Sequence, residues 1–374
     1  MLSSPVASRM AGVSRYAREH GWHLMFQDRM GFAHPFDWMG DGVIATIRQE
    51  PRSLAFLRRL ARRGVPLVDL TCDMPRFPCA RVSADHVAAG RLAAAHLAER
   101  NYKTRAFFSI DRGNVRNRIW RGFTEAGAAE RWCFSQERPR TRWNDWNAVE
   151  RWLAEKFNAF GNPLGVLTYS QGEAAQILDA ALGLGIKVPG DLGVVSGNDD
   201  PILLESQPVP ITAVDTDLER GAYEAAALLD RLMEGKSKVE CRKAKGGKTD
   251  VVEIPPRGVV VRASTAESVA ADPLVAAALR LFMDDAQSRR GVEEIARELN
   301  VARNTLDRRF AAEFGRSASA ELHRMRLASA KRLLANPRNK VEYVARVTGF
   351  SSASHLGTAL RIECGLSPSA LRQM

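Results

Sequence analysis

Basic side chains are concentrated in the last hundred residues of the chain. Residues 275–374 carry 17 Lys and Arg against 10 Asp and Glu, and the whole chain of 374 residues has a net charge of +11. Basic side chains bind polyanions such as nucleic acid by pairing with phosphates. The solvated surface of an Arg-rich helical domain carries a similar excess, so the charge alone leaves both interpretations open.

Two segments of this basic region, residues 292–315 and 341–365, share one pattern. In each, apolar residues recur at helical spacing on both sides of a short turn, at 300–302 in the first segment and around Gly349 in the second. A glycine allows the chain to turn sharply between two crossing helices. The inward-facing residues that we predict are Ile295, Ala296, Leu299, Leu306 and Phe310, then Val344, Ala345, Val347, Leu356 and Leu360.

The repetition of this helix-turn-helix pattern is more specific than either copy. One copy alone resembles any two packed amphipathic helices, whereas here two copies start 49 residues apart with a long amphipathic helix, residues 318–334, between them. Two such units on one rigid helix could enter successive major grooves of DNA, about 34 Å apart.

The region before residue 265 has a different character. Short apolar runs alternate with amphipathic helical patterns, which is typical of parallel sheets covered by helices on both faces. About seven such units suggest two α/β lobes with a ligand cleft at the carboxyl ends of the strands. The predicted strands cover residues 42–46, 65–70, 105–110, 164–169, 192–196 and 211–214.

These patterns predict a two-lobed α/β domain followed by an all-helical domain. We place the first domain at residues 1–265, a polar linker at 266–273 and the helical domain at 274–374. The helical domain would contain both helix-turn-helix units.

Several other function classes lack support in the sequence. There is no Gly-x-Ser-x-Gly motif, phosphate loop or cluster of metal ligands, so we predict no enzyme activity, no metal and no cofactor. The five cysteines have no zinc-type or redox-type spacing. Without a signal peptide or a long apolar run, we expect a cytoplasmic protein that does not enter a membrane.

The helical domain resembles the AraC/XylS family of regulators. The runs RMRLASAKRLL (Arg324–Leu334) and GFSSASHLGTALRIECGLSPSALR (Gly349–Arg372) carry this resemblance, although Leu356 and Cys364 stand where the family usually has Phe. The resemblance implies that double-stranded DNA is the partner. By position, it implies that bases are contacted by Arg303, Asn304, Asp307 and Arg308 and by Ser352, Ser354, His355 and Thr358, and that phosphates are contacted by Lys331 and Arg332.

The first domain resembles the sensor of the xylose operon regulators (XylR type), which is similar to the LacI and periplasmic-binding-protein fold. The resemblance depends on RYAREHGW, DWMGDGVIA, VSADHVAAGRLAAAHL, LGVVSGNDD and IPPRGVVVRAST. It implies a small sugar effector, with D-xylose as the first candidate, and a homodimer that acts with RNA polymerase. A sugar-binding protein without regulatory DNA binding is the alternative.

Candidate sugar-binding residues are Asp199, Arg118, Asp85 and Trp146. Carboxylates and guanidinium groups make paired hydrogen bonds with hydroxyls, and aromatic rings stack on sugar faces. Each has an alternative: a helix cap for Asp199, a surface position for Arg118, a hinge brace for Asp85, and a core position for Trp146. Arg116 and Arg121 compete with Arg118.

The N-terminus departs from this fold, because the chain enters its first helix almost at once. We expect the first strand of the sheet to be missing, with Ser3 and Ser4 as remnants of the loop that follows it. A missing strand would leave an exposed sheet edge, so a version extended upstream should be the more stable one.

Overall fold

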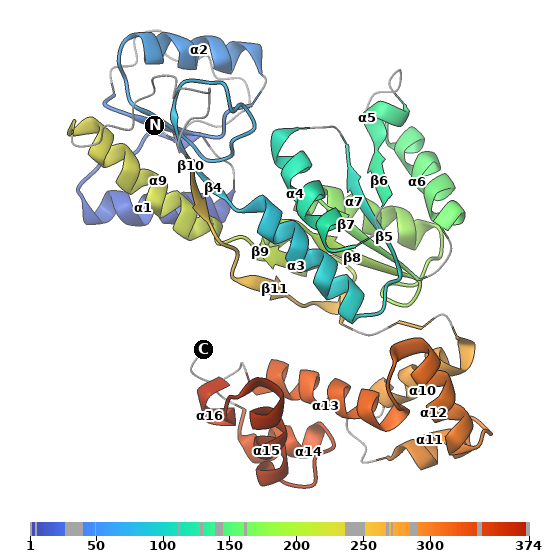
Figure 1. Ribbon diagram of the computed structural model, residues 1–374. Coiled ribbons are helices and arrows are strands. Elements are labelled where there is room, and N and C mark those ends of the chain that lie inside the picture. The colour runs from blue at the N-terminus through green and yellow to red at the C-terminus, as the bar shows by residue number, and fades with distance from the viewer. Residues whose placement is uncertain are drawn as a thin grey trace. The chain divides into compact units, whose positions relative to one another are not determined.

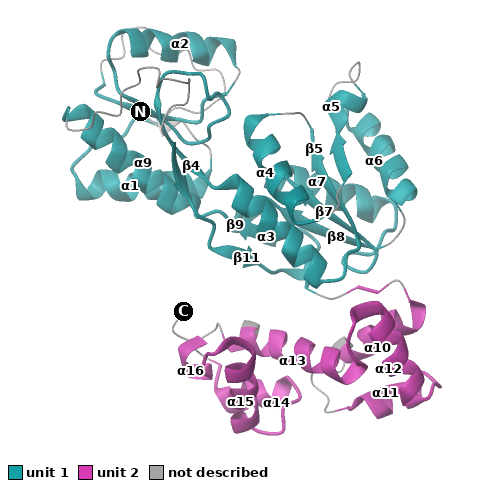
Figure 2. Ribbon diagram, viewed as in Figure 1, with its two compact units in different colours: residues 1–267 teal, residues 268–374 magenta. Residues whose placement is uncertain are grey.

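The computed structural model divides the chain into two compact units, residues 1–267 and 268–374 (Figure 2). Their boundary lies close to the predicted one at residue 265. The residues described are 2–3, 6–26, 40–48, 50–110, 113–127, 130–138, 145–160, 163–235, 251–266, 269–270, 272–284, 290–334 and 339–371.

The first lobe of unit 1 is built on a five-stranded parallel sheet. Successive residues of a strand face opposite sides of the sheet. Ile44 therefore packs with α1 and α9, whereas Val43 and Ala45 pack with α2. In spatial order the strands are β1 (Leu2–Ser3), β2 (Val43–Ala45), β3 (Leu67–Asp69), β4 (Ala80–Ala84) and β10 (Val251–Ile254), and the covering helices are α1 (Ala7–Glu19), α9 (Leu218–Met233) and α2 (Pro51–Arg62).

The second lobe holds a six-stranded sheet in which only β11 is antiparallel to its neighbour (Figure 1). The strands, in spatial order, are β11 (Gly258–Val260), β9 (Thr212–Asp215), β8 (Leu192–Ser196), β7 (Leu164–Thr168), β5 (Thr104–Ser109) and β6 (Glu130–Cys133). Its helices are α3 (His86–Glu99), α4 (Asn114–Glu125), α5 (Phe134–Glu137), α6 (Trp146–Phe160), α7 (Gln171–Gly183) and α8 (Pro201–Glu205), with the short 3₁₀ helix η1 (Ala263–Thr265).

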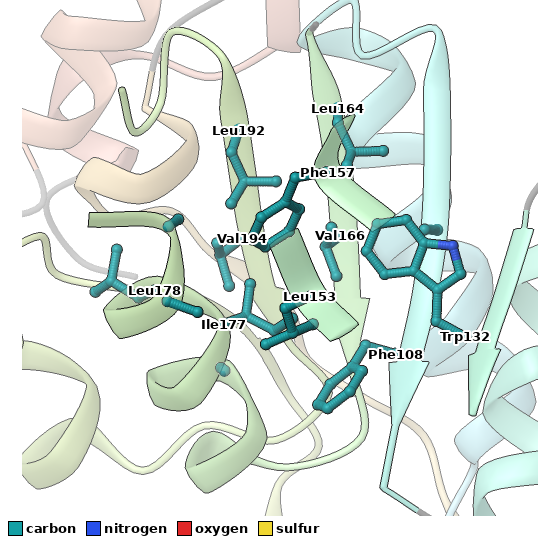
Figure 3. Close-up of a cluster of buried hydrophobic side chains, with 14 of the residues drawn as sticks. Phe108, Trp132, Leu153, Phe157, Leu164, Val166, Ile177, Leu178, Leu192 and Val194 are labelled. Carbon is teal, nitrogen blue, oxygen red and sulfur yellow. The ribbon is translucent and has the colours of Figure 1, made fainter. Parts of the chain in front are cut away.

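One face of this sheet forms a large hydrophobic core with α6 and α7. Figure 3 shows Val166 and Val194 of the sheet facing Ile177 of α7 and Leu153 and Phe157 of α6. These side chains are almost completely removed from water, and burial of apolar surface is the main force that holds the layers together.

Helices α3 and α4 cover the second lobe in unusually close contact. A Cβ atom at Gly122 of α4 would lie 1.9 Å from the carbonyl oxygen of Val87, and one at Gly90 of α3 would lie 2.2 Å from that of Ile119. Only glycine fits at these two positions, because any side chain would push the helix backbones apart.

The chain crosses between the lobes three times, after β4, after β9 and after β10. The crossings are tied to one another by backbone hydrogen bonds. Asp85 N donates to Ile254 O at 2.8 Å, and Arg257 N donates to Asp215 O at 2.8 Å. Arg257 also lies 3.1 Å from the buried carboxylate of Asp217. The three crossings therefore form one hinge, in which hydrogen bonds join the segments.

Unit 2 is helical throughout its described residues. Its helices are α10 (Pro273–Asp284), α11 (Val292–Glu298), α12 (Arg303–Phe314), α13 (Ala318–Leu334), α14 (Val341–Val347), α15 (Ala353–Cys364) and α16 (Pro368–Leu371). They form two hydrophobic clusters: α10, α11 and α12 pack on the first half of α13, and α14 and α15 pack on its second half.

The structure confirms the predicted fold class and changes some details. Strands β4 and β10 were not expected, because Arg81 and Glu253 interrupt their apolar runs. The expected absence of a first strand needs correction, since Leu2–Ser3 pair with β2 as a two-residue strand. Asp272, placed in the linker, belongs to unit 2 and accepts a hydrogen bond at 2.8 Å from Leu274 N at the start of α10.

None of the helices in the described part of the chain is long and apolar enough to cross a membrane.

We expect Gly122→Ala to lower the free energy of unfolding of unit 1 by roughly 1–3 kcal/mol, because the new Cβ collides with backbone. All seven tryptophans precede residue 153, so urea unfolding followed by tryptophan fluorescence measures unit 1 alone. Gly172→Ala in the first turn of α7 is the control. Nothing lies within 4 Å of its Cβ, and alanine should stabilise that helix by up to about 1 kcal/mol. A Gly122→Ala variant as stable as the parent would contradict the close helix contact.

A second prediction concerns two buried histidines of α3. Burial, with Arg118 and Arg9 nearby, lowers the pKa of His86 to about 3. Burial, with Arg100 nearby, lowers the pKa of His96 to about 4. Below about pH 6.5 the unfolded chain binds protons that the folded chain does not. The stability of unit 1 is therefore complete above that pH and should fall by roughly 2 kcal/mol per histidine as the pH drops to 5.

Urea unfolding at pH 8 and pH 5 tests this prediction. His96 Nε2 lies 2.7 Å from Thr265 Oγ1, and His96→Gln keeps a group that can bond there. This variant should lose less stability on acidification than the parent does, and the pH 8 measurement controls for any loss of packing. Equal losses in both proteins would contradict the assignment.

Candidate functional site

The two helix-turn-helix units of unit 2 have the same turn geometry. The second residue after the first helix has a positive φ in both, 55° at Asn300 and 75° at Gly349. In both units the next residue closes the turn with a 2.9 Å hydrogen bond, from Val301 N to Ala296 O and from Phe350 N to Ala345 O. The second helices, α12 and α15, therefore leave the two turns in the same way.

Both second helices bury the predicted apolar face. The side chains of Leu306 and Phe310 in α12 and of Leu356 and Leu360 in α15 are completely buried. Because a helix that buries one stripe exposes the opposite one, the polar residues between them face outward.

The polar face of α12 contains three of its four predicted residues. Arg303, Asn304 and Arg308 are exposed. Arg303 is held by ion pairs to Glu293 at 2.7 Å and to Asp307 at 3.6 Å.

Asp307 has a structural contact. Its Oδ1 accepts a hydrogen bond at 3.0 Å from Ala318 N, at the start of α13. This interaction satisfies one of the backbone N–H groups that a helix start leaves unpaired. Asp307 thus joins α12 to α13, and its contact with a base stays a prediction.

Three of the four residues predicted for the second unit lie within α15 and are exposed: Ser354, His355 and Thr358. His355 Nδ1 lies 3.0 Å from Ser351 Oγ, and its ring packs edge-on against Phe350. Ser352 is exposed too, but its hydroxyl caps α15 by accepting from His355 N at 3.1 Å. Its role is therefore at least partly structural.

The two residues predicted to contact phosphates lie on α13. Lys331 is partly exposed, 3.9 Å from Glu363. The side chain of Arg332 lies outside the described residues. Sequence analysis missed Arg361, an exposed basic residue of α15 three positions after Thr358, although its i+3 spacing would have indicated the shared face.

In unit 1 the lobes meet at the carboxyl ends of their strands. Asn114 Nδ2 of α4 donates to Cys72 O at 2.7 Å, and Val115 N donates to Asp73 Oδ1 at 3.2 Å. Cys72 and Asp73 follow β3 of the first lobe, whereas α4 belongs to the second. These two hydrogen bonds join the lobes across the cleft.

A group of polar side chains, the cleft cluster, lies at this junction around Tyr169. Its other members are Arg9, Asp73, Arg116 and Asn198. The Arg116 guanidinium lies 4.0 Å from the Tyr169 ring centre and 3.6 Å from the buried Glu173 carboxylate. The cluster combines cationic donors, a carboxylate, an amide and an aromatic ring, which are the groups that bind a polyhydroxylated ligand.

Burial shapes the electrostatics of the cleft cluster. Burial lowers the pKa of Arg9, an effect opposed by Tyr169 and Asp69, and its guanidinium donates to Thr46 Oγ1 at 3.2 Å. Burial also raises the pKa of Tyr169, and Asp73 raises it further. Tyr169 therefore remains a neutral phenol that can donate or accept a hydrogen bond.

Asn198 lies where we expected Asp199. Its Nδ2 donates to Tyr169 O at 2.9 Å, and its Oδ1 accepts from Thr216 Oγ1 at 3.2 Å. Asp199 is instead paired with Arg262 at 2.8 Å. The contact of Asp199 with a sugar therefore stays a prediction, and the structure adds an ion pair to a buried arginine.

Arg118 and Asp85 line a cavity of about 480 Å³, of the size that small-molecule sites have. Cys72 and Glu253 also line it, and Arg118 binds the Glu253 carboxylate. Asp85 caps α3 by accepting from Val87 N at 3.1 Å and Ala88 N at 3.0 Å. These capping bonds, together with the bond from Asp85 N to Ile254 O, favour the hinge alternative for Asp85.

Trp146 lies apart from the other candidates. It begins α6, is 38% exposed, and is not among the residues that line the 480 Å³ cavity. Its stacking role stays a prediction. Among the described residues, no three His, Cys, Asp or Glu side chains are grouped so that they could hold a metal ion.

Comparison with known proteins assigns both regions. Residues 94–265 match the periplasmic binding protein-like domain family, and residues 295–374 match a helix-turn-helix domain family. The chain is 24% identical to the xylose operon regulatory protein of Escherichia coli over 97% of this chain and 92% of that protein. It is 22% identical to the protein of the same name from Haemophilus influenzae, over 96% and 93%.

A solved structure has the same fold. The structure of the xylose-binding transcription activator xylR aligns with 100% of this chain and 97% of its own, with a TM-score of 0.61 and 20% identity. Both domains, their order and their full length thus match one kind of protein. The chain thus joins a periplasmic binding protein-like domain to a helix-turn-helix domain, and over almost its full length it is similar to xylose operon regulatory proteins.

Proposed function

We propose that this regulator binds double-stranded DNA through the outer faces of α12 and α15 and that a small sugar in the cleft of unit 1 controls this binding. The observation that carries the proposal is the pair of equivalent turns at Asn300 and Gly349, each followed by a helix with an exposed polar face. The 17-residue helix α13 joins them. It is about 25 Å long at 1.5 Å per residue, which is compatible with units in neighbouring major grooves.

The exposed residues divide into two groups by chemistry. Arg308 and Asn304 can each make paired hydrogen bonds to a base, arginine to guanine and asparagine to adenine. Ser354 and Thr358 can bond to either kind of base. Lys331 is suited to phosphates, which position a protein without reading sequence.

The cleft cluster suits a sugar better than an anion or an apolar ligand, because it offers donors, acceptors and a ring together. We propose D-xylose as the first candidate, since the E. coli and H. influenzae relatives are xylose operon regulatory proteins. Arg116, Asp73 and Tyr169 would contact it, and Asn198 would hold the edge of the cleft.

Control by the sugar requires that it bind one conformation more tightly than another. The bonds of Asn114 and Val115 to the first lobe are made only when the lobes are together. A sugar that touches both lobes would stabilise this closed form. We propose that closure changes a sensor-mediated homodimer and re-aims its DNA-binding domains, which act with RNA polymerase in the cytoplasm.

The DNA interface predicts different effects for two adjacent arginines. Arg308→Ala should weaken binding to a specific site by roughly 1–3 kcal/mol if the side chain contacts a base. Arg309→Ala is the matched control, because Arg309 is paired with Asp272 at 2.9 Å and should change affinity little. Fluorescence anisotropy with a site selected by the wild-type protein measures both. Equal losses for the two variants would contradict the assigned face.

Salt dependence separates this function from a sugar-binding protein without DNA activity. Affinity for DNA should fall steeply and log-linearly with salt concentration, because neutralised phosphates release counterions. Affinity that does not change with salt would favour the alternative.

The cleft predicts which variant loses the sugar response. Xylose at about 100 times its dissociation constant should stabilise unit 1 by about 2.7 kcal/mol, seen as a higher melting temperature by tryptophan fluorescence. Arg116→Met should lose this increase, whereas Arg121→Met, an exposed position on the same helix, should keep it. Each variant is compared with itself without sugar. An unchanged increase in Arg116→Met would exclude the cleft cluster as the site.

A further inference from the structure

Helix α13 belongs to two hydrophobic clusters that share no residue. Leu322 and Met325 pack in the first cluster, with α11 and α12, whereas Leu327 and Ala330 pack in the second, with α14 and α15. Arg326 stands between these two sets, where apolar packing passes from one helix-turn-helix unit to the other.

The guanidinium group of Arg326 contacts the backbone of both units. Its Nη2 donates to Arg290 O at 2.9 Å, just before α11 of the first unit. It also packs beneath the turn of the second unit, where a Cβ atom on Gly349 would lie 2.7 Å from Arg326 Nε and 2.9 Å from its Cζ. One side chain thus bridges the start of the first unit and the turn of the second.

Gly349 has two reasons to be glycine. Its φ of 75° is unfavourable for other residues, and its missing side chain leaves the space that the guanidinium fills. Asn300, the equivalent residue of the first unit, has a side chain at a similar φ of 55°. The left-handed turn alone therefore does not explain the glycine, whereas contact with Arg326 does.

We propose that Arg326 is a positioning residue that fixes the orientation of one helix-turn-helix unit relative to the other and so sets the spacing of the two DNA half-sites. A planar guanidinium with fixed donor directions suits this role, because it holds an angle as well as a distance. This inference rests on the proposed function, because Arg326 can set a half-site spacing only if both units bind DNA.

The first experiment selects binding sites from randomised double-stranded DNA with the full-length protein. The wild type should enrich two half-sites at one spacing. Arg326→Met should enrich the same half-sites at several spacings, and its discrimination against a one-base-pair change should fall about tenfold, the loss expected for one well-placed contact. Lys331→Met, on the same helix, should bind more weakly at the unchanged spacing. A single, equally sharp spacing for Arg326→Met would overturn the proposal.

The second experiment does not depend on DNA. Spin labels are attached at Ala312→Cys in α12 and Ile362→Cys in α15, both exposed positions. Pulsed electron paramagnetic resonance then measures the distance between the two helix-turn-helix units. Cys241 and Cys364 are replaced by Ser, and Cys72, Cys79 and Cys133 are buried. The distance distribution should be narrow in the parent and broad with Arg326→Met or Gly349→Ala.

The two experiments separate the two failures. A narrow distribution in Arg326→Met overturns the positioning role whatever the DNA result. A broad distribution, combined with no sequence enriched by the wild type, supports the positioning role and overturns the DNA-binding proposal. Circular dichroism at 222 nm checks that each variant retains its helices.

Discussion

Helix α13 supplies buried side chains to two hydrophobic clusters at once, and unit 2 depends on this sharing. The first cluster combines α10, α11 and α12 with the first half of α13, and the second combines α14 and α15 with its second half. A continuous helix is stiff, so the same residues that complete the two cores also limit how the two outer faces can move. Asp307, which binds the start of α13, adds a polar contact to the first of these junctions.

Unit 1 consists of two lobes that share a cleft and a hinge. In the proposed function its lobes separate and rejoin, and the cleft between them takes side chains from both. Three crossings held by backbone hydrogen bonds keep the hinge in register, while the cleft itself is closed by only a few side-chain contacts. The hinge is built from strand ends, and the carboxyl ends of parallel strands gather polar residues at one edge. The hinge and the ligand site are therefore neighbours for a topological reason.

Several polar residues near helix starts have structural contacts. Asp85, Ser352 and Asp307 all accept hydrogen bonds from backbone N–H groups that begin a helix. Such positions combine two properties, a short polar side chain and a location at the edge of the fold, that are also the properties of a binding residue. In this protein these side chains accept hydrogen bonds from backbone N–H groups, because a buried N–H group without a partner is energetically costly.

Two domains, most helices and the buried faces of α12 and α15 could be predicted from the sequence, because periodicity of apolar residues is a local property that burial enforces. The resemblance to known regulators was also visible, through motifs that keep their order along the chain. The sequence did not show that Asp199 pairs with Arg262, because the two residues are 63 positions apart. Strands β4 and β10 were not expected for a related reason: the buried Arg81 is accommodated in β4 because carbonyl oxygens of the preceding residues Met74 and Cys79 accept its hydrogen bonds and Asp69 lies 3.7 Å away. Tertiary structure decided these points because hydrogen-bond partners distant in sequence determine where a polar side chain can go.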